Sequence, residues 1–162
     1  MFVSNTSTLV LLAKVGCLEV FIDIAPNIEI PSQVKEEALF KKGSYYARLI
    51  HRLIEDKRII VKGVKDTVLQ NILSEFRLDK GEAAAYSLYN PKKHRAILTD
   101  DGELIKLCKL ENIPFICSMA IIVRLYEKKK LKKDNAQSIL KKLSVIGRYS
   151  EDLYEHFRSE VK

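Results

Sequence analysis

Short apolar runs alternate with segments of helical pattern along most of this chain, and this alternation sharply limits the folds open to it. The runs that predict strands fall at residues 1–4, 28–31, 59–61, 96–98 and 113–116. Between them, apolar residues recur with the spacing of an amphipathic helix. Strands separated by helices are typical of a parallel sheet with helices on both faces. We therefore predict an α/β fold built on a mostly parallel sheet.

Length and charge narrow the class of protein further. A chain of 162 residues with 47% hydrophobic side chains suits one domain with a sizeable core. The formal net charge of +7 favours an anionic partner, and nucleic acid is the commonest such partner. The lysine-rich run at residues 128–133 has a simpler explanation, a solvated helix end whose dipole favours cations.

The cysteines and the apolar runs indicate the compartment. Cys17, Cys108 and Cys117 are odd in number and share no paired spacing, so we expect neither disulfides nor a zinc site. This usage is typical of a reducing compartment. The longest apolar run, residues 115–123, is too short to cross a bilayer, and no signal peptide is recognisable. We expect a cytoplasmic protein with no membrane partner.

Ser7 is placed to cap a helix over residues 8–14, and two acidic segments also have the pattern of helix starts. Asp79 is placed to cap a helix, and Glu82, three residues later, completes the pattern of a capping box. Asp100 and Asp101 follow the apolar run at residues 96–98 in the same way. Capping alone accounts for each segment and contributes about 1 kcal/mol of helix stability.

The predicted topology gives these acids a second interpretation. The carboxyl ends of parallel strands lie at one edge of a sheet, so Asn5, Glu37, Glu82 and Asp101 should lie near one another. Two like charges ~4 Å apart repel by about 1 kcal/mol even in water. Mg²⁺ or Mn²⁺ offsets this repulsion because both ions prefer oxygen ligands. A cation held in this way can activate water and neutralise charge on a phosphodiester.

Four segments that carry these residues resemble, in order, the motifs of PIN-domain proteins, and more narrowly a prokaryotic branch related to VapC-type toxins. They are Ser4-Asn5-Thr6-Ser7, residues 31–37, residues 78–83 and residues 98–101, and residues 117–128 resemble the closing strand-to-helix unit of the family. The resemblance implies a single PIN-like, Rossmann-like domain over residues 1–162. Its family-like core covers residues 1–131, and residues 132–162 form a C-terminal helical extension.

The resemblance also implies an activity, Mg²⁺- or Mn²⁺-dependent cleavage of RNA. Glu37, Glu82 and Asp101 match the metal-ligand positions of the family, and Asn5 occupies a fourth catalytic position where most members carry Asp. A neutral amide there removes one negative charge from the metal site. The resemblance gives supporting roles around the site to Thr6, Asp79, Asp100 and Ser118.

Two functions remain open at this stage. The first is a toxin-like endoribonuclease that forms a homodimer and is inhibited by a small antitoxin protein. The alternative is a catalytically weak or inactive PIN-fold module that binds RNA or protein, and Asn5 is the feature that separates the two. Flavodoxin-like phosphoryl chemistry is disfavoured because no glycine-rich phosphate loop follows any predicted strand.

Two apolar surfaces complete the expectations. Residues 45–54 have an apolar side that is a candidate dimer surface. A capping box of Asp134 and Gln137 should open an amphipathic helix with Ile139, Leu140, Leu143 and Ile146 on its apolar side. Such a stripe must be buried, either on the domain or on a second copy.

Overall fold

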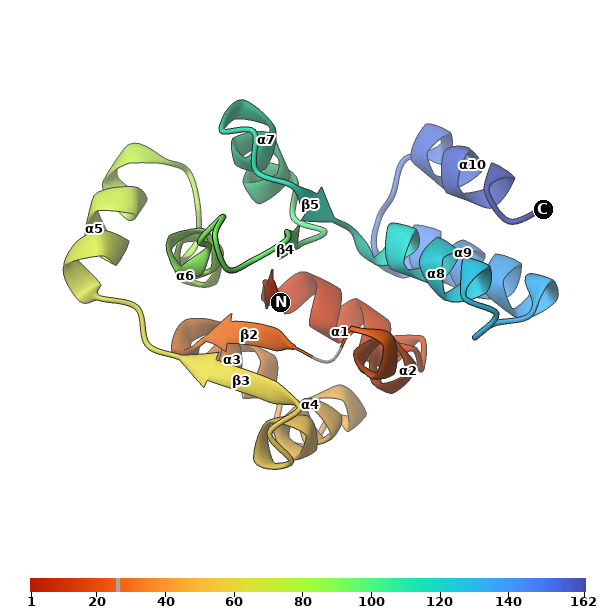
Figure 1. Cartoon of the computed structure of the whole chain (residues 1–162), viewed down its shortest axis with the longest axis horizontal. Coiled ribbons are helices and arrows are strands. Elements are labelled where there is room, and N and C mark those ends of the chain that lie inside the picture. The colour runs from red at the N-terminus through yellow and green to blue at the C-terminus, as the bar shows by residue number, and fades with distance from the viewer. Residues whose placement is uncertain (26) are drawn as a thin grey trace.

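A single parallel sheet organises the chain. The computed structural model describes residues 1–25 and 27–162. All neighbouring strands of the sheet run parallel, in the order β3-β2-β1-β4-β5 (Figure 1). The strands are β1 (Phe2–Ser4), β2 (Ile28–Pro31), β3 (Ile59–Lys62), β4 (Ile97–Leu98) and β5 (Phe115–Ile116). The predicted α/β class is confirmed.

The strand order reverses beside β1. The chain lays down β1, β2 and β3 outward in one direction, then returns to place β4 and β5 on the other side of β1. Val3 of β1 therefore lies between Glu29 of β2 and Ile97 of β4. In open α/β sheets, ligands bind outside the carboxyl ends of the strands at such a switch point. Here that position follows Ser4 and Leu98.

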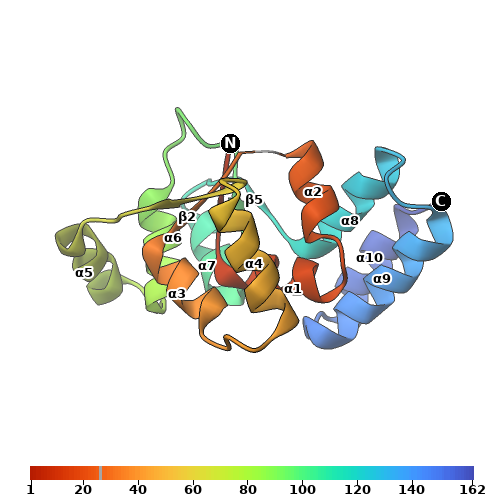
Figure 2. The ribbon, with the colours of Figure 1, turned by 90° about the horizontal axis from the view of Figure 1, so that it is seen from below.

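Helices cover both faces of the sheet (Figures 1 and 2). Within the described residues they are α1 (Thr6–Lys14), α2 (Leu18–Ile24), α3 (Ser32–Leu39), α4 (Tyr45–Glu55), α5 (Asp66–Glu75), α6 (Lys80–Leu88), α7 (Gly102–Leu110), α8 (Ser118–Glu127), α9 (Lys133–Ile146) and α10 (Glu151–Ser159).

Alternate strand residues face opposite layers of helices, as the period of two in a strand requires. Ile28, Ile30 and Leu98 belong to the larger core cluster, which includes α1, α2, α4, α8 and α9. Val3 and Ile97 belong to a second cluster, with side chains of α6 and α7. No helix in the described part of the chain combines the length and apolarity needed to cross a membrane.

The C-terminal helices pack on the domain. α9 packs against α8, and α10 against α9 (Figure 1, right). Leu140 and Leu143 of α9 are completely buried, whereas Ile146, which was also expected on the buried side, is 38% exposed. The apolar stripe of residues 134–145 is thus covered by this chain itself.

The expected dimer surface on residues 45–54 is wrong. The apolar side of α4 faces the core of its own chain: Ala47, Leu49, Ile50 and Leu53 are all buried. Packing of the amphipathic face within the domain leaves that face unavailable to a second copy.

Two predicted helix caps are also wrong, because tertiary contacts recruit the side chains. Asn5, not Ser7, caps α1: its Oδ1 accepts the Thr6 N–H at 2.8 Å. Ser7 Oγ instead accepts the N–H of Asp100 at 3.1 Å. The predicted Asp134–Gln137 capping box does not form, because α9 begins without a side-chain cap. Gln137 donates to the carbonyl of Val161 instead.

Candidate active site

Asn5 lies at the switch point of the sheet, directly after β1. It is only 3% exposed, and both ends of its amide are engaged. While Oδ1 caps α1, Nδ2 donates to Thr99 Oγ1 at 3.4 Å. The same Thr99 oxygen accepts the N–H of Asp101 at 3.1 Å. One hydroxyl therefore connects Asn5 to the turn that carries the acids after β4.

Glu37 reaches the site from α3 and is held by two donors. Its Oε2 accepts the Thr6 hydroxyl at 2.5 Å, and its Oε1 accepts the Gly81 N–H at 3.1 Å. Partial burial raises the pKa of Glu37, and the nearby charge of Asp79 adds to the rise against the effect of these hydrogen bonds. Thr6 therefore fixes one oxygen of the Glu37 carboxylate.

The capping box at the start of α6 forms as predicted. Asp79 Oδ1 accepts the Glu82 N–H at 2.8 Å, and Glu82 Oε2 accepts the Asp79 N–H at 3.0 Å. This reciprocal pair satisfies two backbone donors of the first turn. The box also fixes the Glu82 carboxyl group at the sheet edge, facing Asp101.

Glu82 lies near two other acids, Asp79 and Asp101. The Glu82 residue is 9% exposed, and its pKa is raised to about 8. Burial is the largest cause, and the nearby carboxyl groups of Asp101 and Asp79 add to it. Asp101 also caps α7, since its Oδ1 accepts the Leu104 N–H at 2.9 Å. Capping and acid clustering therefore coexist in the same residues.

Asp100 ties three elements together instead of facing outward. Its Oδ2 accepts the Thr8 hydroxyl at 2.6 Å, and its Oδ1 accepts the Ser118 hydroxyl at 2.8 Å. The Ser118 N–H lies 3.0 and 3.1 Å from the two oxygens. Burial raises the pKa of Asp100 against these hydrogen bonds. Because protein donors occupy both oxygens, Asp100 holds the end of β4 against α1 and α8.

The donor set at this edge suits a hard divalent cation. Glu37, Glu82 and Asp101 offer carboxylate oxygens, the ligands that Mg²⁺ and Mn²⁺ prefer. In the part of the chain that the structure describes, no three acidic, histidine or cysteine side chains form a ready-made metal cage. Mg²⁺ needs only one or two protein carboxylates because it keeps several waters. Glu82 and Asp101 would supply these carboxylates, and Thr6 and Gly81 hold that of Glu37.

Several residues of the site were not anticipated from the sequence. Thr8 and Thr99 hold the acidic turn through hydroxyl contacts, and Tyr149 reaches Ser118 with its hydroxyl at 3.1 Å. Gly81 is needed because a Cβ there would lie 2.4 Å from Glu37 Oε1. The run of hydroxyl residues from Thr6 to Thr8 was the available signal for Thr8. No local sequence pattern points to Tyr149, because its partner Ser118 is 31 positions away.

A doubly wound parallel sheet with acidic side chains at its switch point defines the class, a Rossmann-like α/β domain with an acidic site. A family model described as a PIN domain matches residues 1–162, and the chain belongs to that family. Neither a curated protein nor a solved structure matches the chain. Membership indicates a nuclease-type function, with RNA binding and divalent-metal dependence as general properties of the family.

Proposed function

We propose that the protein is a metal-dependent endoribonuclease whose site consists of Asn5, Glu37, Glu82 and Asp101. The observation that carries the proposal is geometric. Thr6 and Gly81 hold the Glu37 carboxylate at the switch point of the sheet, and Asp79 and Asp101 lie near enough to Glu82 to raise its pKa. Such a cluster of acids is unfavourable unless a proton or a cation reduces the repulsion.

The residues of the site have different proposed roles. Glu82 and Asp101 would bind the cation, and the two caps they form fix their positions on α6 and α7. A bound Mg²⁺ or Mn²⁺ would supply an activated water and neutralise charge on the phosphodiester. Glu37, whose carboxylate is held by Thr6 and Gly81, would complete the ligand set or accept a proton. Asn5 orients the start of α1 through its cap.

One observation favours the alternative, a PIN-fold module with weak or no catalysis. The Asn5 amide brings no charge to the site, and its cap and its contact with Thr99 occupy both of its polar atoms. The site therefore relies on three carboxylates. Such a module would bind RNA or protein through the same surface.

Two finer assignments belong to the proposal. The resemblance to VapC-type toxins supports a toxin component inhibited by a small antitoxin and acting as a homodimer. The chain's excess of basic residues, 28 against 21 acidic ones, supports RNA as the substrate. Size-exclusion chromatography with light scattering tests the homodimer: a single mass near 18.6 kDa at all concentrations would contradict it.

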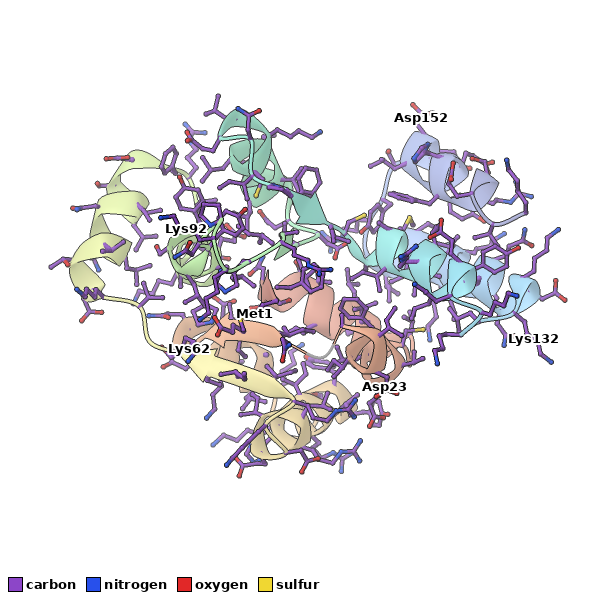
Figure 3. The ribbon with its side chains drawn as sticks, in the orientation of Figure 1. Met1, Asp23, Lys62, Lys92, Lys132 and Asp152 are labelled. Atoms are coloured by element: carbon purple, nitrogen blue, oxygen red, sulfur yellow. The ribbon has the colours of Figure 1, made fainter. Side chains whose placement is uncertain are left out.

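Mn²⁺ titration calorimetry and cleavage of a mixed RNA pool test the activity. Asp101→Asn should abolish metal binding and cleavage, because one of two paired carboxylates is lost. Asp152→Asn is the matched control, since Asp152 is an exposed acid on α10, away from the sheet (Figure 3). If Asp101→Asn keeps the affinity and cleavage of the parent, the acids act only as helix caps and the nuclease proposal is wrong.

A further inference from the structure

The corner between α3 and α4 leaves two aromatic side chains in solvent. Phe40 is 83% exposed and Tyr45 is 62% exposed. Lys41 and Lys42 lie between them in the sequence, and both are exposed. Exposed large apolar side chains are unremarkable when they are isolated. Here two exposed aromatic residues flank two exposed lysines in the sequence. This combination suits a ligand with rings and negative charge.

Two adjoining grooves extend from this corner. The first, of about 620 Å³, lies between α3 and the end of β3 and is lined by Lys35, Phe40 and Lys42 among others. The second, of about 240 Å³, lies on the α4 side and is lined by Lys42, Arg48 and His51. Leu39 and Lys42 line both grooves, so the two grooves adjoin, and we treat them together as one track. We call it the α3–α4 track.

The α3–α4 track is positively charged. Among the described residues, Lys35, Lys42 and Arg48 take part in no ion pair. Glu36 is the one carboxylate that lines either groove. Free cations spaced along a groove are suited to successive phosphates of a nucleic acid backbone.

The track begins at the edge of the sheet that carries the acidic site. α3 starts at Ser32, directly after the carboxyl end of β2, and presents Glu37 one turn before Phe40. The connection between α3 and α4 lies on the side of the molecule opposite the N-terminus (Figure 2). Lys62, at the carboxyl end of β3, lies on the same part of the sheet (Figure 3). Ser32, at the start of α3, lines the first groove, so a strand of RNA along this track would reach the carboxyl end of β2.

We propose that the α3–α4 track binds single-stranded RNA, with a base stacked on Phe40 and phosphates held by Lys35, Lys42 and Arg48. The inference rests on the proposed function in taking RNA as the substrate. Stacking requires an unpaired base, so the track discriminates against duplex RNA. A protein partner fits less well, because the centres of protein interfaces are depleted in lysine.

The test is fluorescence anisotropy of a labelled, unstructured oligouridine with the full chain carrying Asp101→Asn, in EDTA. Phe40→Leu keeps an apolar side chain but removes the stacking ring, and it should weaken binding about tenfold. Lys42→Ala should weaken binding and lower the salt slope by about 0.7. Lys132→Ala, a cation at the start of α9 and far from the track, is the control and should leave affinity unchanged (Figure 3).

The outcomes separate this inference from the proposed function. Loss of binding in Phe40→Leu, with no cleavage by the parent protein, supports the track and contradicts the nuclease. Cleavage that depends on Asp101, with binding unaffected by Phe40→Leu and Lys42→Ala, overturns the track alone. Equal affinity for duplex RNA also overturns it. So does self-association that Phe40→Leu abolishes while RNA affinity stays the same, since the corner would then be a protein interface.

Discussion

The backbone N–H of Gly81 donates to Oε1 of Glu37 at 3.1 Å, and a side chain at position 81 would occupy the place of that oxygen. α3 and α6 can approach this closely because residue 81 carries a hydrogen in place of a Cβ atom. The contact fixes one oxygen of Glu37 while Thr6 fixes the other. Glycine is therefore required here by close approach, although it is a poor helix former.

The first prediction follows from this contact. Gly81→Ala should displace the Glu37 carboxylate and lower RNA cleavage at least tenfold, because the new Cβ would lie 2.4 Å from Oε1. Stability should change by less than about 1 kcal/mol, because the clash is with the flexible end of the Glu37 side chain and alanine is the better helix former. Gly63→Ala is the control, since nothing lies within 4 Å of a Cβ there. Equal activity of Gly81→Ala and the parent would show that the position of Glu37 is unimportant.

The second prediction concerns Asn5. Asn5→Asp keeps an oxygen to cap α1 and adds one negative charge to the site, so Mn²⁺ should bind more tightly and cleavage should increase. Asn71→Asp adds the same charge on exposed α5 and should change neither. Titration calorimetry and cleavage assays measure both effects. If only the Asn5→Asp variant cleaves RNA, the natural protein is the binding module.

The third prediction is a dependence of stability on pH. Glu29 is 2% exposed; burial raises its pKa, but hydrogen bonds and charge from Lys93 and His94 outweigh burial and lower the pKa below the usual 4.5. A lowered folded-state pKa stabilises the fold above the unfolded value, and that stability is lost as pH falls through the folded pKa. Glu29→Gln should therefore cost about 3–5 kcal/mol at pH 7, and less in acid.

Urea unfolding between pH 3 and pH 8 measures this effect. Glu103→Gln is the control, because its pair with Lys106 is exposed and contributes little. A difference between Glu29→Gln and the parent that stays constant from pH 8 to pH 3 would show that the charge of Glu29 is irrelevant.

The fourth prediction concerns the C-terminal segment. Tyr149→Phe removes the hydroxyl that meets Ser118 Oγ at 3.1 Å, and Ser118 in turn holds Asp100. Loss of this one hydrogen bond should cost about 0.5–1.5 kcal/mol of stability and reduce cleavage a few-fold. Tyr154→Phe, on α10, is the matched control. Chemical unfolding and single-turnover cleavage separate the two effects, and a change in stability without a change in cleavage would limit Tyr149 to a structural role.

Local sequence patterns predicted some of the contacts between residues a few positions apart. The Asp79–Glu82 capping box was predictable because its two residues are three positions apart. The alternation of apolar runs predicted the parallel sheet, since strand period and helix period follow from backbone geometry alone. The short β4 and β5 were located for the same reason, although the predicted bounds of β5 were too wide.

The tertiary structure decided the contacts between residues far apart in the chain. Sequence reasoning gave the α1 cap to Ser7, but folding brings Asp100 within reach of Ser7, and Asn5 caps the helix instead. The Gly81–Glu37 contact and the engagement of Tyr149 with Ser118 span 44 and 31 positions. No local pattern encodes such pairs, because they depend on how closely two packed elements approach. The sequence alone determined which residues could form an acidic site; packing determined which carboxylates meet there, and which are held by hydroxyls and backbone amides.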